Sequence, residues 1–303
     1  MTILLTGASG FLGRRVVELM IAEGQDVVSL GRSAPEPTAA STVRFMAVDL
    51  TDRDAVHRAA AAVGDVDGVI HLAALVPKTS SEDEAANAFA CNVMGTVHLF
   101  EAFGRPGQAN VFASTAEVYG LPESHAPLDE DSPVRPRSWY GASKAAAELY
   151  CTALERRGAM RMATLRFTVL YGAGDTISRA VPNFVRSAVQ GDPIRIFGGE
   201  ELRDYLHVDD AARAVHLAWK HRITGTFNAG SGRGIAVRDA ASAILHIAGG
   251  ESAVEVLPRE KPAADIVLNV ARFRDATGFA PSHVFPEGLE EQIAWAAAGN
   301  TRL

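Results

Sequence analysis

The sequence predicts an α/β protein built on an open, doubly wound, parallel sheet. Short runs rich in valine and isoleucine alternate with helix-period segments through the first half of the chain. These runs do not alternate strictly between apolar and polar residues, which is typical of strands buried on both faces. Strand–helix repetition of this kind indicates βαβ units that wind right-handedly into one sheet.

Each expected strand of the first half is a short apolar run, and each expected helix is an amphipathic stretch. The strands are Ile3–Leu5, Val27–Leu30, Val43–Val48, Gly68–Leu72, Val111–Ala113 and Met162–Phe167. The helices lie near residues 11–24, 52–63, 84–104 and 138–158. Thr51 is the expected N-cap of the second helix, because its hydroxyl can accept a backbone N–H.

The rhythm changes after residue 172, where glycine, proline and charged residues become denser. Phe227–Gly230 reads as one more strand of the main sheet, so the second half is interleaved with the first. Pro122–Arg137, with four prolines, is expected to be a long surface loop. The helices expected in this half lie near residues 180–190, 209–220 and 237–248.

This change in composition and the returning strand predict two interleaved domains. The first spans residues 1–172 and takes back a strand near 226–231. The second, residues 173–303, is mainly a smaller substrate-binding α/β domain.

The totals exclude several classes of function. The formal charge is 29 − 36 = −7, so a basic nucleic-acid-binding face is not expected. No apolar run approaches the roughly 20 residues of a membrane span, and no signal peptide precedes the first strand. The two cysteines have neither metal nor redox spacing, so we expect a cytoplasmic protein without a metal site.

The segment Thr6–Gly13 follows the first strand directly and opens the first helix. Gly7 permits a tight turn, Gly10 lets the backbone approach a pyrophosphate, and Gly13 allows close helix–strand packing. Backbone amides at the start of the helix would then face the phosphates. The segment therefore predicts a Rossmann dinucleotide site, in which Ser9, Phe11 and Leu12 also contact the cofactor.

The end of the second strand lacks the acid that usually accepts the ribose hydroxyls of NAD. Arg32 and Ser33 stand there instead, and Arg14 or Arg15 could add charge from the first helix. These residues favour NADP over NAD, because a cation can hold the extra 2′-phosphate. The alternative is that Arg32 is simply solvated.

Two later strand ends complete the expected cofactor site. Asp49 and Leu50 would meet the adenine; the alternative is that Asp49 only supports the turn at Thr51. His71 reads as a packed strand-end histidine rather than a catalyst. Small residues after it let the cofactor lie against the backbone, and the expected contacts are Leu72, Ala73 and Ala74.

Thr115, Tyr140 and Lys144 form the expected catalytic set. Thr115 leaves the fifth strand at its carboxyl end, where ligands of open α/β sheets bind. Tyr140 and Lys144 share one face of the next long helix, four residues apart. The ammonium would lower the pKa of the phenol, so that Tyr140 can exchange a proton with a carbinol oxygen.

With these residues the sequence resembles the extended short-chain dehydrogenases/reductases, specifically the NAD-dependent epimerase/dehydratase branch that acts on nucleotide sugars. The resemblance runs nearly end to end. It is carried by TGASGFLG (6–13), VDL (48–50), HLAA (71–74), NVMGT (92–96), STAEVYG (114–120), YGASK (140–144), LRFTVLYG (165–172), RDYLHVDD (203–210) and FNAGSG (227–232).

The resemblance implies roles for further residues. Asn92 would help to order the active-site helix and contact the cofactor, and Arg203 would bind the sugar-nucleotide diphosphate unless it only pairs with Asp204. Arg195 and Phe197 fall where the base is often bracketed. Family members also often form homodimers through the helices at 84–104 and 138–158. The expected substrate contacts are Lys78, Thr115, Glu117, Arg179, Arg195, Phe197 and Arg203.

Three departures from the family pattern bear on the reaction. Ala116 replaces the acid that dehydratases of this branch carry, so 4,6-dehydration is not expected. Val169 replaces an asparagine that many epimerases place on the substrate diphosphate, and Arg32 favours NADP. The sequence therefore predicts NADPH-dependent reduction of a 4-keto sugar nucleotide. The alternatives are a 4-epimerase with retained NAD, a reductase of a non-nucleotide carbonyl compound, and a non-catalytic NADP sensor.

Overall fold

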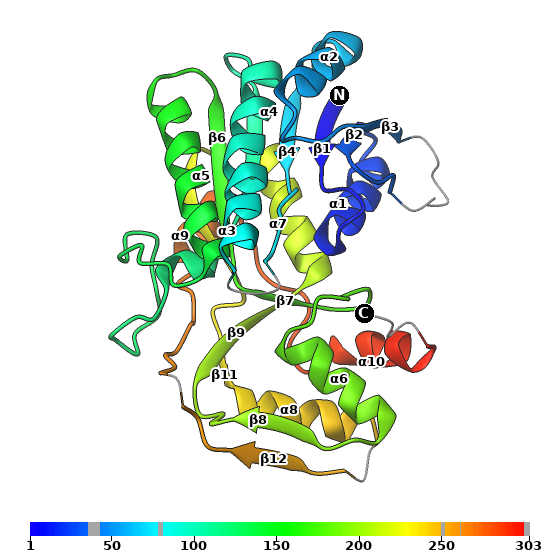
Figure 1. The fold of residues 1–303 in the computed structure, drawn as a ribbon, viewed down its shortest axis with the longest axis vertical. Helices are drawn as coiled ribbons and strands as arrows, with labels where there is room; N and C mark the ends of the chain where they lie inside the picture. The colour runs from blue at the N-terminus through cyan, green and yellow to red at the C-terminus, as the bar shows by residue number, and fades with distance from the viewer. Residues whose placement is uncertain (36–42, 78–80, 250–251, 261, 300–303) are drawn as a thin grey trace.

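A computed structural model of the chain describes residues 1–35, 43–77, 81–249, 252–260 and 262–299. A large layered body contains the N-terminal half, and a smaller lobe adjoins it at the lower end of the view in Figure 1. The C-terminal helix α10 (Leu289–Ala297) belongs to the smaller lobe.

The large body is built around a seven-stranded parallel sheet with the order β10-β6-β5-β4-β1-β2-β3. The order reverses between β1 and β4, which is the topological switch point of a Rossmann sheet. The six strands expected in the first half of the chain are all present, with ends that differ by at most two residues, and the returning strand is β10. The bounds of the seven strands are β1 Thr2–Thr6, β2 Asp26–Gly31, β3 Arg44–Ala47, β4 Gly68–His71, β5 Ala109–Thr115, β6 Arg161–Phe167 and β10 Gly225–Ala229.

Helices cover both faces of this sheet. One buried cluster joins Leu4, Leu30 and Phe112 of the sheet to helices α2, α4 and α5. A second joins the opposite face to α1 and α7, with α9 against β10. The bounds are α1 Phe11–Ala22, α2 Arg53–Val63, α4 Gly95–Phe103, α5 Trp139–Arg156, α7 Val208–Lys220 and α9 Ala271–Thr277.

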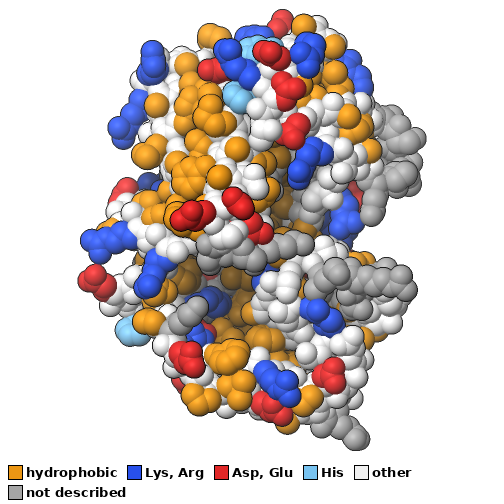
Figure 2. Space-filling view, viewed as in Figure 1, with side chains coloured by type: hydrophobic (Ala, Val, Ile, Leu, Met, Phe, Trp, Pro, Cys, Tyr) orange, Lys and Arg blue, Asp and Glu red, His pale blue; other side chains and the backbone are white. Residues whose placement is uncertain are grey.

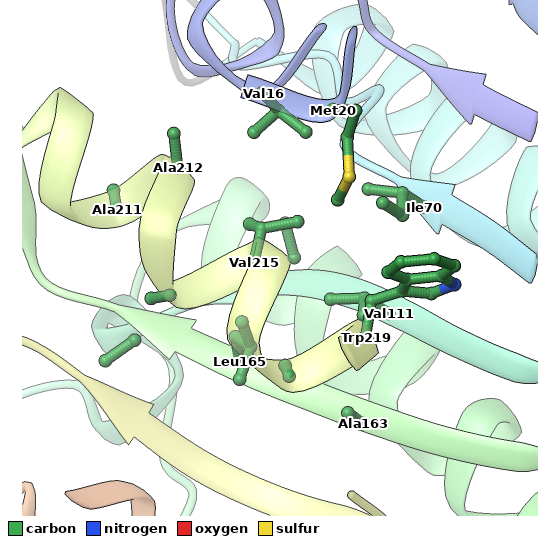
Figure 3. Close-up of a cluster of buried hydrophobic side chains, with 14 of the residues drawn as sticks. Val16, Met20, Ile70, Val111, Ala163, Leu165, Ala211, Ala212, Val215 and Trp219 are labelled. Atoms are coloured by element: carbon green, nitrogen blue, oxygen red, sulfur yellow. The ribbon is translucent and has the colours of Figure 1, made fainter. Parts of the chain in front are cut away.

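Helix α7 packs against α1 and against strands β4, β5 and β6 of the sheet. Figure 3 shows Val16 and Met20 of α1, Val215 and Trp219 of α7, and sheet residues such as Val111 meeting in one apolar cluster. Full burial of such a side chain stabilises the fold by about 1.5–3 kcal/mol. This packing explains why a helix from the second half of the chain belongs to the large body.

The helix expected near residues 84–104 is three segments. Helix α3 (Glu82–Phe89) continues into a π-helical turn, Ala90–Met94, before α4 begins. The turn carries Asn92, which is fully buried. Such π-turns often mark functional sites.

The start of α2 differs from the sequence prediction by one residue. Asp52, not Thr51, is the N-cap, because its carboxylate accepts the N–H of Ala55 at 2.9 Å. The hydroxyl of Thr51 instead donates to Asp49 at 2.8 Å.

The smaller lobe contains two short sheets and three helices around their own apolar core. The expected helices at 180–190 and 237–248 are α6 and α8. The bounds in this lobe are β7 Val169–Tyr171, α6 Ala180–Gln190, β8 Ile194–Phe197, β9 Leu202–His207, β11 Gly234–Ala236, α8 Val237–Ile247, β12 Val254–Leu257 and α10.

The two parts exchange segments, since β10 and α7 come from the second half yet join the large body, while β7 lies in the smaller lobe. We therefore propose a dinucleotide-binding domain that comprises most of residues 1–168 together with α7, β10 and α9, and a substrate-binding domain made of the rest. Within the described ranges, no helix is long and apolar enough to cross a membrane.

Asp210, in the first turn of α7, ties the C-terminal segment to the large body. Its buried carboxylate accepts the backbone N–H groups of Ser282 and His283 at 2.9–3.0 Å, and the Ser282 hydroxyl at 2.6 Å. Arg213 donates to the same carboxylate at 2.6 Å. This joint fixes the chain that leads into α10.

Candidate active site

The glycine loop after β1 has the geometry of a phosphate cradle. Gly7 has φ +78°, and a Cβ there would lie 2.7 Å from the Ala73 nitrogen. A Cβ on Gly13 would lie 1.9 Å from the Gly7 oxygen, so α1 can approach β1 only without a side chain. Gly10 caps α1 without a side-chain hydrogen bond, which leaves the first amides of the helix for an anion.

The cofactor contacts expected in this loop lie together. Ser9 and Gly10 are exposed, whereas Phe11 and Leu12 are half-buried at the start of α1. The donor set of helix amides fits the pyrophosphate of a dinucleotide, and Gly7 and Gly13 have the packing roles that the sequence predicts.

Arg32 is exposed just after β2. Its charge acts on Asp49 and on the thiol of Cys91, so these side chains lie near one another. Arg15 does not support Arg32, because it pairs with Asp209 at 3.2 Å and Glu291 at 3.1 Å.

Asp49 supports the turn that follows β3. One carboxylate oxygen accepts both the backbone N–H and the hydroxyl of Thr51, at 2.9 and 2.8 Å. These bonds hold the pKa of Asp49 below its usual value. The second oxygen is not used by the turn, so an adenine contact stays a prediction, and Leu50 is buried beneath it.

His71 is a packed residue, as predicted. Its ring lies between the hydroxyls of Thr6, at 2.6 Å, and Thr96, at 2.9 Å. The Thr6 hydroxyl also accepts the N–H of Ala73 at 3.3 Å, which holds the segment after β4 against the glycine loop. Leu72, Ala73 and Ala74 therefore line the switch point of the sheet.

Asn92 connects the segment after β4 to helix α5. Its side chain exchanges hydrogen bonds with the backbone of Leu75, at 2.7 and 2.9 Å, and donates to the Ser143 hydroxyl at 2.9 Å. Ser143 in turn donates to the carbonyl of Tyr140 at 2.8 Å. Asn92 thus has the contacts of a residue that orders the active-site helix.

The turn after β5 packs directly on the start of α5. Glu117 accepts the hydroxyl hydrogen bond of Ser138, the N-cap of α5, at 2.6 Å. A Cβ on Gly141 would lie 2.8 Å from the Glu117 carbonyl oxygen, so the two segments touch. Thr115, whose hydroxyl accepts the Glu117 N–H at 3.2 Å, therefore lies close to the turn that carries Tyr140.

The expected effect of Lys144 on Tyr140 is not found in this structure. Burial raises the pKa of Tyr140, the Glu117 carboxylate raises it further, and Arg179 opposes both. The ammonium of Lys144 lies instead over the ring of Phe112, 4.0 Å from its centroid. Arg179 is therefore the cation whose charge acts on the Tyr140 phenol in this structure.

Arg179 is held at the N-cap of α6 by two partners. Its guanidinium binds the buried carboxylate of Asp175 at 2.8 Å and the carbonyl oxygen of Leu170 at 3.0 Å. Burial raises the pKa of Asp175, and the pair with Arg179 opposes that effect. Arg179 is therefore fixed by its pair with Asp175 and by the Leu170 carbonyl.

The remaining expected substrate residues lie in the smaller lobe. Arg195 and Phe197 share the exposed face of β8, and Arg195 pairs with Glu255 at 2.9 Å. Arg203 does not pair with Asp204, which is buried and accepts N–H groups of Ser231 and Gly232. Lys78 lies outside the described residues.

Arg203 is fixed by backbone carbonyl groups. One terminal nitrogen donates to the oxygens of Leu202, at 2.9 Å, and Ala264, at 2.6 Å. Burial lowers the pKa of Arg203, and the nearby charge of Arg259 also lowers it. Arg259 itself donates to the main-chain carbonyl of Phe197 and pairs with the Glu201 carboxylate.

Sequence reasoning missed four residues of this region. The N-cap position of Ser138 and the spacing of Ser143 from Tyr140 were available signals. No pattern in the sequence pointed to Arg259, because the segment that carries it approaches Arg203 only in the folded structure. The ring beneath Lys144 also had no signal, since Phe112 reads as ordinary strand core.

His207, Asp209 and His283 form a separate cluster whose ligand atoms lie within 4.8 Å of one another. The two imidazole rings stack at 4.1 Å with 24° between their planes, so their lone pairs do not converge on one ion. Arg15 already pairs with Asp209. We interpret the cluster as part of the joint around Asp210.

The sheet order, the glycine cradle and the Tyr–Lys helix together define a Rossmann protein of the extended short-chain dehydrogenase/reductase type. The chain belongs to the NAD dependent epimerase/dehydratase family, whose model matches residues 3–230.

Relatives share this fold over nearly their whole length. A dTDP-glucose 4,6-dehydratase of Streptomyces niveus is 30% identical over 97% of this chain and 92% of its own. A putative UDP-glucose 4-epimerase of Methanocaldococcus jannaschii is 30% identical over 98% and 99%. The structure of a Thermus thermophilus UDP-glucose 4-epimerase in complex with NAD has a TM-score of 0.84 and 29% identity, and covers 97% of this chain and 98% of its own.

Proposed function

We propose that this protein transfers hydride at C4 of a nucleoside diphosphate sugar and that it is a 4-epimerase. The observation that supports the proposal is the packing of the turn after Thr115 on the start of α5, the helix that carries Tyr140 and Lys144. Relatives of full length named as UDP-glucose 4-epimerases favour epimerisation.

In the proposed reaction, each side chain has one task. Thr115 donates a hydrogen bond to the C4 oxygen, and Tyr140 takes the proton of that hydroxyl and later returns it. Lys144 stabilises the phenolate, once the ligands bring it close to Tyr140. A bound nicotinamide supplies the acceptor and donor of the hydride. Epimerisation requires the sugar to turn over between the two transfers, so that the hydride returns to its other face.

Dehydration is a poorer fit to the same site. Ala116 is buried and carries no acid, while Glu117 is exposed and bound to Ser138. Elimination of water across C5 and C6 needs a positioned acid and base in addition to the tyrosine. Glu117 alone does not supply that pair.

The sugar nucleotide would lie across the two parts of the molecule. Arg203 and Arg259 carry adjacent guanidinium groups that suit a diphosphate, and Phe197 offers an exposed ring for the base. Arg179 would contact the substrate near Tyr140. These local arginines allow an acidic protein to bind an anionic substrate.

The cofactor preference that we propose is NADP. Arg32 stands where NAD-selective sites carry an acid, and its charge faces the same end of the site as Asp49. The fold relative in complex with NAD shows only that a close structural neighbour uses NAD.

Net reduction of a 4-keto sugar nucleotide by NADPH is the second candidate. Arg32 favours it, because a net reductase draws on exchangeable NADPH whereas an epimerase recycles a retained cofactor. Thr115, Tyr140 and Lys144 serve both reactions equally, since the chemistry at the carbinol is the same.

We also propose a homodimer formed by the face of α3–α5. Hydrophobic side chains gather there in Figure 2, and Phe89, Met94 and Leu149 are 37%, 47% and 73% exposed. Burial of such a patch favours self-association.

Light scattering after size exclusion should give the mass of a dimer, and Leu149→Glu should give a monomer. A monomeric wild type would contradict this assignment.

The reaction is tested with UDP-glucose and dTDP-glucose, each incubated with the protein and with NAD or NADP. Proton NMR should reveal the C4 epimer without net change in nicotinamide absorbance at equilibrium. Nicotinamide in the supernatant of denatured protein should be present at near-stoichiometric amounts for an epimerase.

Absence of retained nicotinamide, together with oxidation of NADPH by a 4-keto sugar nucleotide, would establish the reductase instead. No turnover of any sugar nucleotide with either cofactor would reject both candidates.

A further inference from the structure

An aromatic ring lies beneath the buried ammonium of Lys144. The nitrogen is 4.0 Å from the centroid of the Phe112 ring, and the two residues are 1% and 0% exposed. Within the described part of the chain, Lys144 forms neither a hydrogen bond nor an ion pair with another side chain, and its ammonium contacts the Phe112 ring. The ring face is therefore the contact that stabilises this charge.

Titratable groups surround Lys144 from each element packed against it. Glu148 and Cys151 lie on its own helix, Cys91 on the π-helical turn, and His71 on β4. Burial lowers the pKa of Lys144 to about 8, and the helix and turn groups oppose that effect. Burial thus destabilises the charged form of Lys144, and these neighbouring groups offset only part of that effect.

His71 does not add a second cation. Its ring lies 5.7 Å from the Phe112 ring, and both ring nitrogens are hydrogen-bonded to threonine hydroxyls. Burial, with the charge of Lys144, lowers the pKa of His71 to about 3. A neutral His71 leaves Phe112 to face one cation only.

We propose that Phe112 is a positioning residue of the active site, whose ring face holds the ammonium of Lys144 charged and fixed against strand β5 in the free protein. The proposal rests on the proposed function, in which Lys144 is catalytic. Loss of the ring would favour the neutral amine over the ammonium. The pKa of Lys144 would then fall, and the alkaline limit of activity would move to lower pH.

The chain has four lysines, Lys78, Lys144, Lys220 and Lys261, so their side-chain NMR signals can be resolved after isotopic labelling of lysine. Lys144→Met assigns the signal of Lys144. We expect a midpoint near 8 in the wild-type protein. Phe112→Leu should lower that midpoint by about one pH unit, the size of a desolvated cation–π contact.

Two further variants separate the ring's electrostatics from packing. A trifluorinated phenylalanine placed at position 112 alone keeps the shape but weakens the quadrupole, and should lower the midpoint in the same direction. Phe100→Leu is the matched control, because Phe100 is also buried and lies beside His71 without contacting Lys144. It should destabilise the protein and leave the midpoint unchanged.

An unchanged midpoint in both Phe112 variants, or an equal shift in the Phe100 control, would overturn the proposal. The titration needs no turnover, so it is independent of the reaction. The Phe112 variants could lower the midpoint as expected while Tyr140→Phe keeps full activity. That result would support the contact between Phe112 and Lys144 and would reject the proposed function instead.

Discussion

Tyr140 carries two opposing electrostatic influences that differ from those expected of a Tyr–Lys pair. Glu117 raises its pKa and Arg179 lowers it, whereas Lys144 lies over Phe112. The i,i+4 spacing correctly predicts a shared helix face but not the direction of a long, flexible side chain. The position of a lysine ammonium depends on the whole tertiary environment, and here the ammonium contacts an aromatic ring on strand β5.

Arg32 is the residue on which the cofactor preference depends. Arg32→Glu should shift the preference from NADPH towards NADH by tenfold or more, because a carboxylate repels the 2′-phosphate and accepts ribose hydroxyl groups. Titrations of each dinucleotide against wild type and variant measure the ratio of dissociation constants.

The matched control for this variant is Arg15→Gln, which removes a charge on α1 that already pairs with Asp209 and Glu291. It should leave the ratio of the two dissociation constants unchanged. Unchanged selectivity in Arg32→Glu would mean that Arg32 does not read the 2′ position.

At the scale of elements, apolar periodicity predicts the six N-terminal strands and most helices to within a few residues. The π-helical turn at Ala90–Met94 was not predictable, since its residues continue the helical pattern. The bounds of the strands β8, β9, β11 and β12 were not predicted, although β9 is six residues long. Their pairing depends on contacts between segments far apart in the sequence, such as β8 with β12.

The N-terminus of α7 supplies the joint between the parts of the molecule. Burial alone would raise the pKa of Asp210, but hydrogen bonds from Ser282 and His283 outweigh it and hold the pKa below its usual value. A carboxylate with a lowered pKa stabilises the fold above the unfolded-state pKa, which is about 3.9. That stability is lost as the pH falls through the folded-state value.

Asp210→Asn should therefore lower the free energy of unfolding at pH 7 by about 2–4 kcal/mol, because several donors lose a charged acceptor. The difference should narrow below about pH 4, where the wild-type carboxyl also becomes neutral. Urea unfolding at a series of pH values measures this gap. Asp209→Asn, half-exposed on the same turn, should have a smaller effect; an equal loss in both variants would contradict the role of the joint.

At the scale of the whole molecule, the sequence predicts an interleaved chain, and the structure specifies which segments cross over. Phe227–Gly230 identifies the returning strand from its apolar run. The assignment of α7 to the large body was not predictable, because its apolar face fits a helix of either part. Helix α7 belongs to the large body because it packs against α1, and that contact joins residues about 200 positions apart in the sequence.

The crossing segments bring the two halves of the proposed substrate site together. The glycine cradle and Tyr140 belong to the large body, while Arg203, Arg259 and Phe197 belong to the smaller lobe. A ligand that spans them must be long and anionic at its centre. A nucleoside diphosphate sugar has both properties, and this agreement is the main reason to treat it as the substrate class.

The most direct test of hydride transfer through Tyr140 uses UDP-glucose labelled with deuterium at C4, with dTDP-glucose labelled in the same way as a parallel substrate. The account predicts that the C4 epimer retains deuterium at C4, because the hydride returns to the carbon that it left. Tyr140→Phe should form epimer at least about a thousandfold more slowly, since the proton has no other acceptor. Product that has lost the label to solvent, or full activity in Tyr140→Phe, would contradict the central claim.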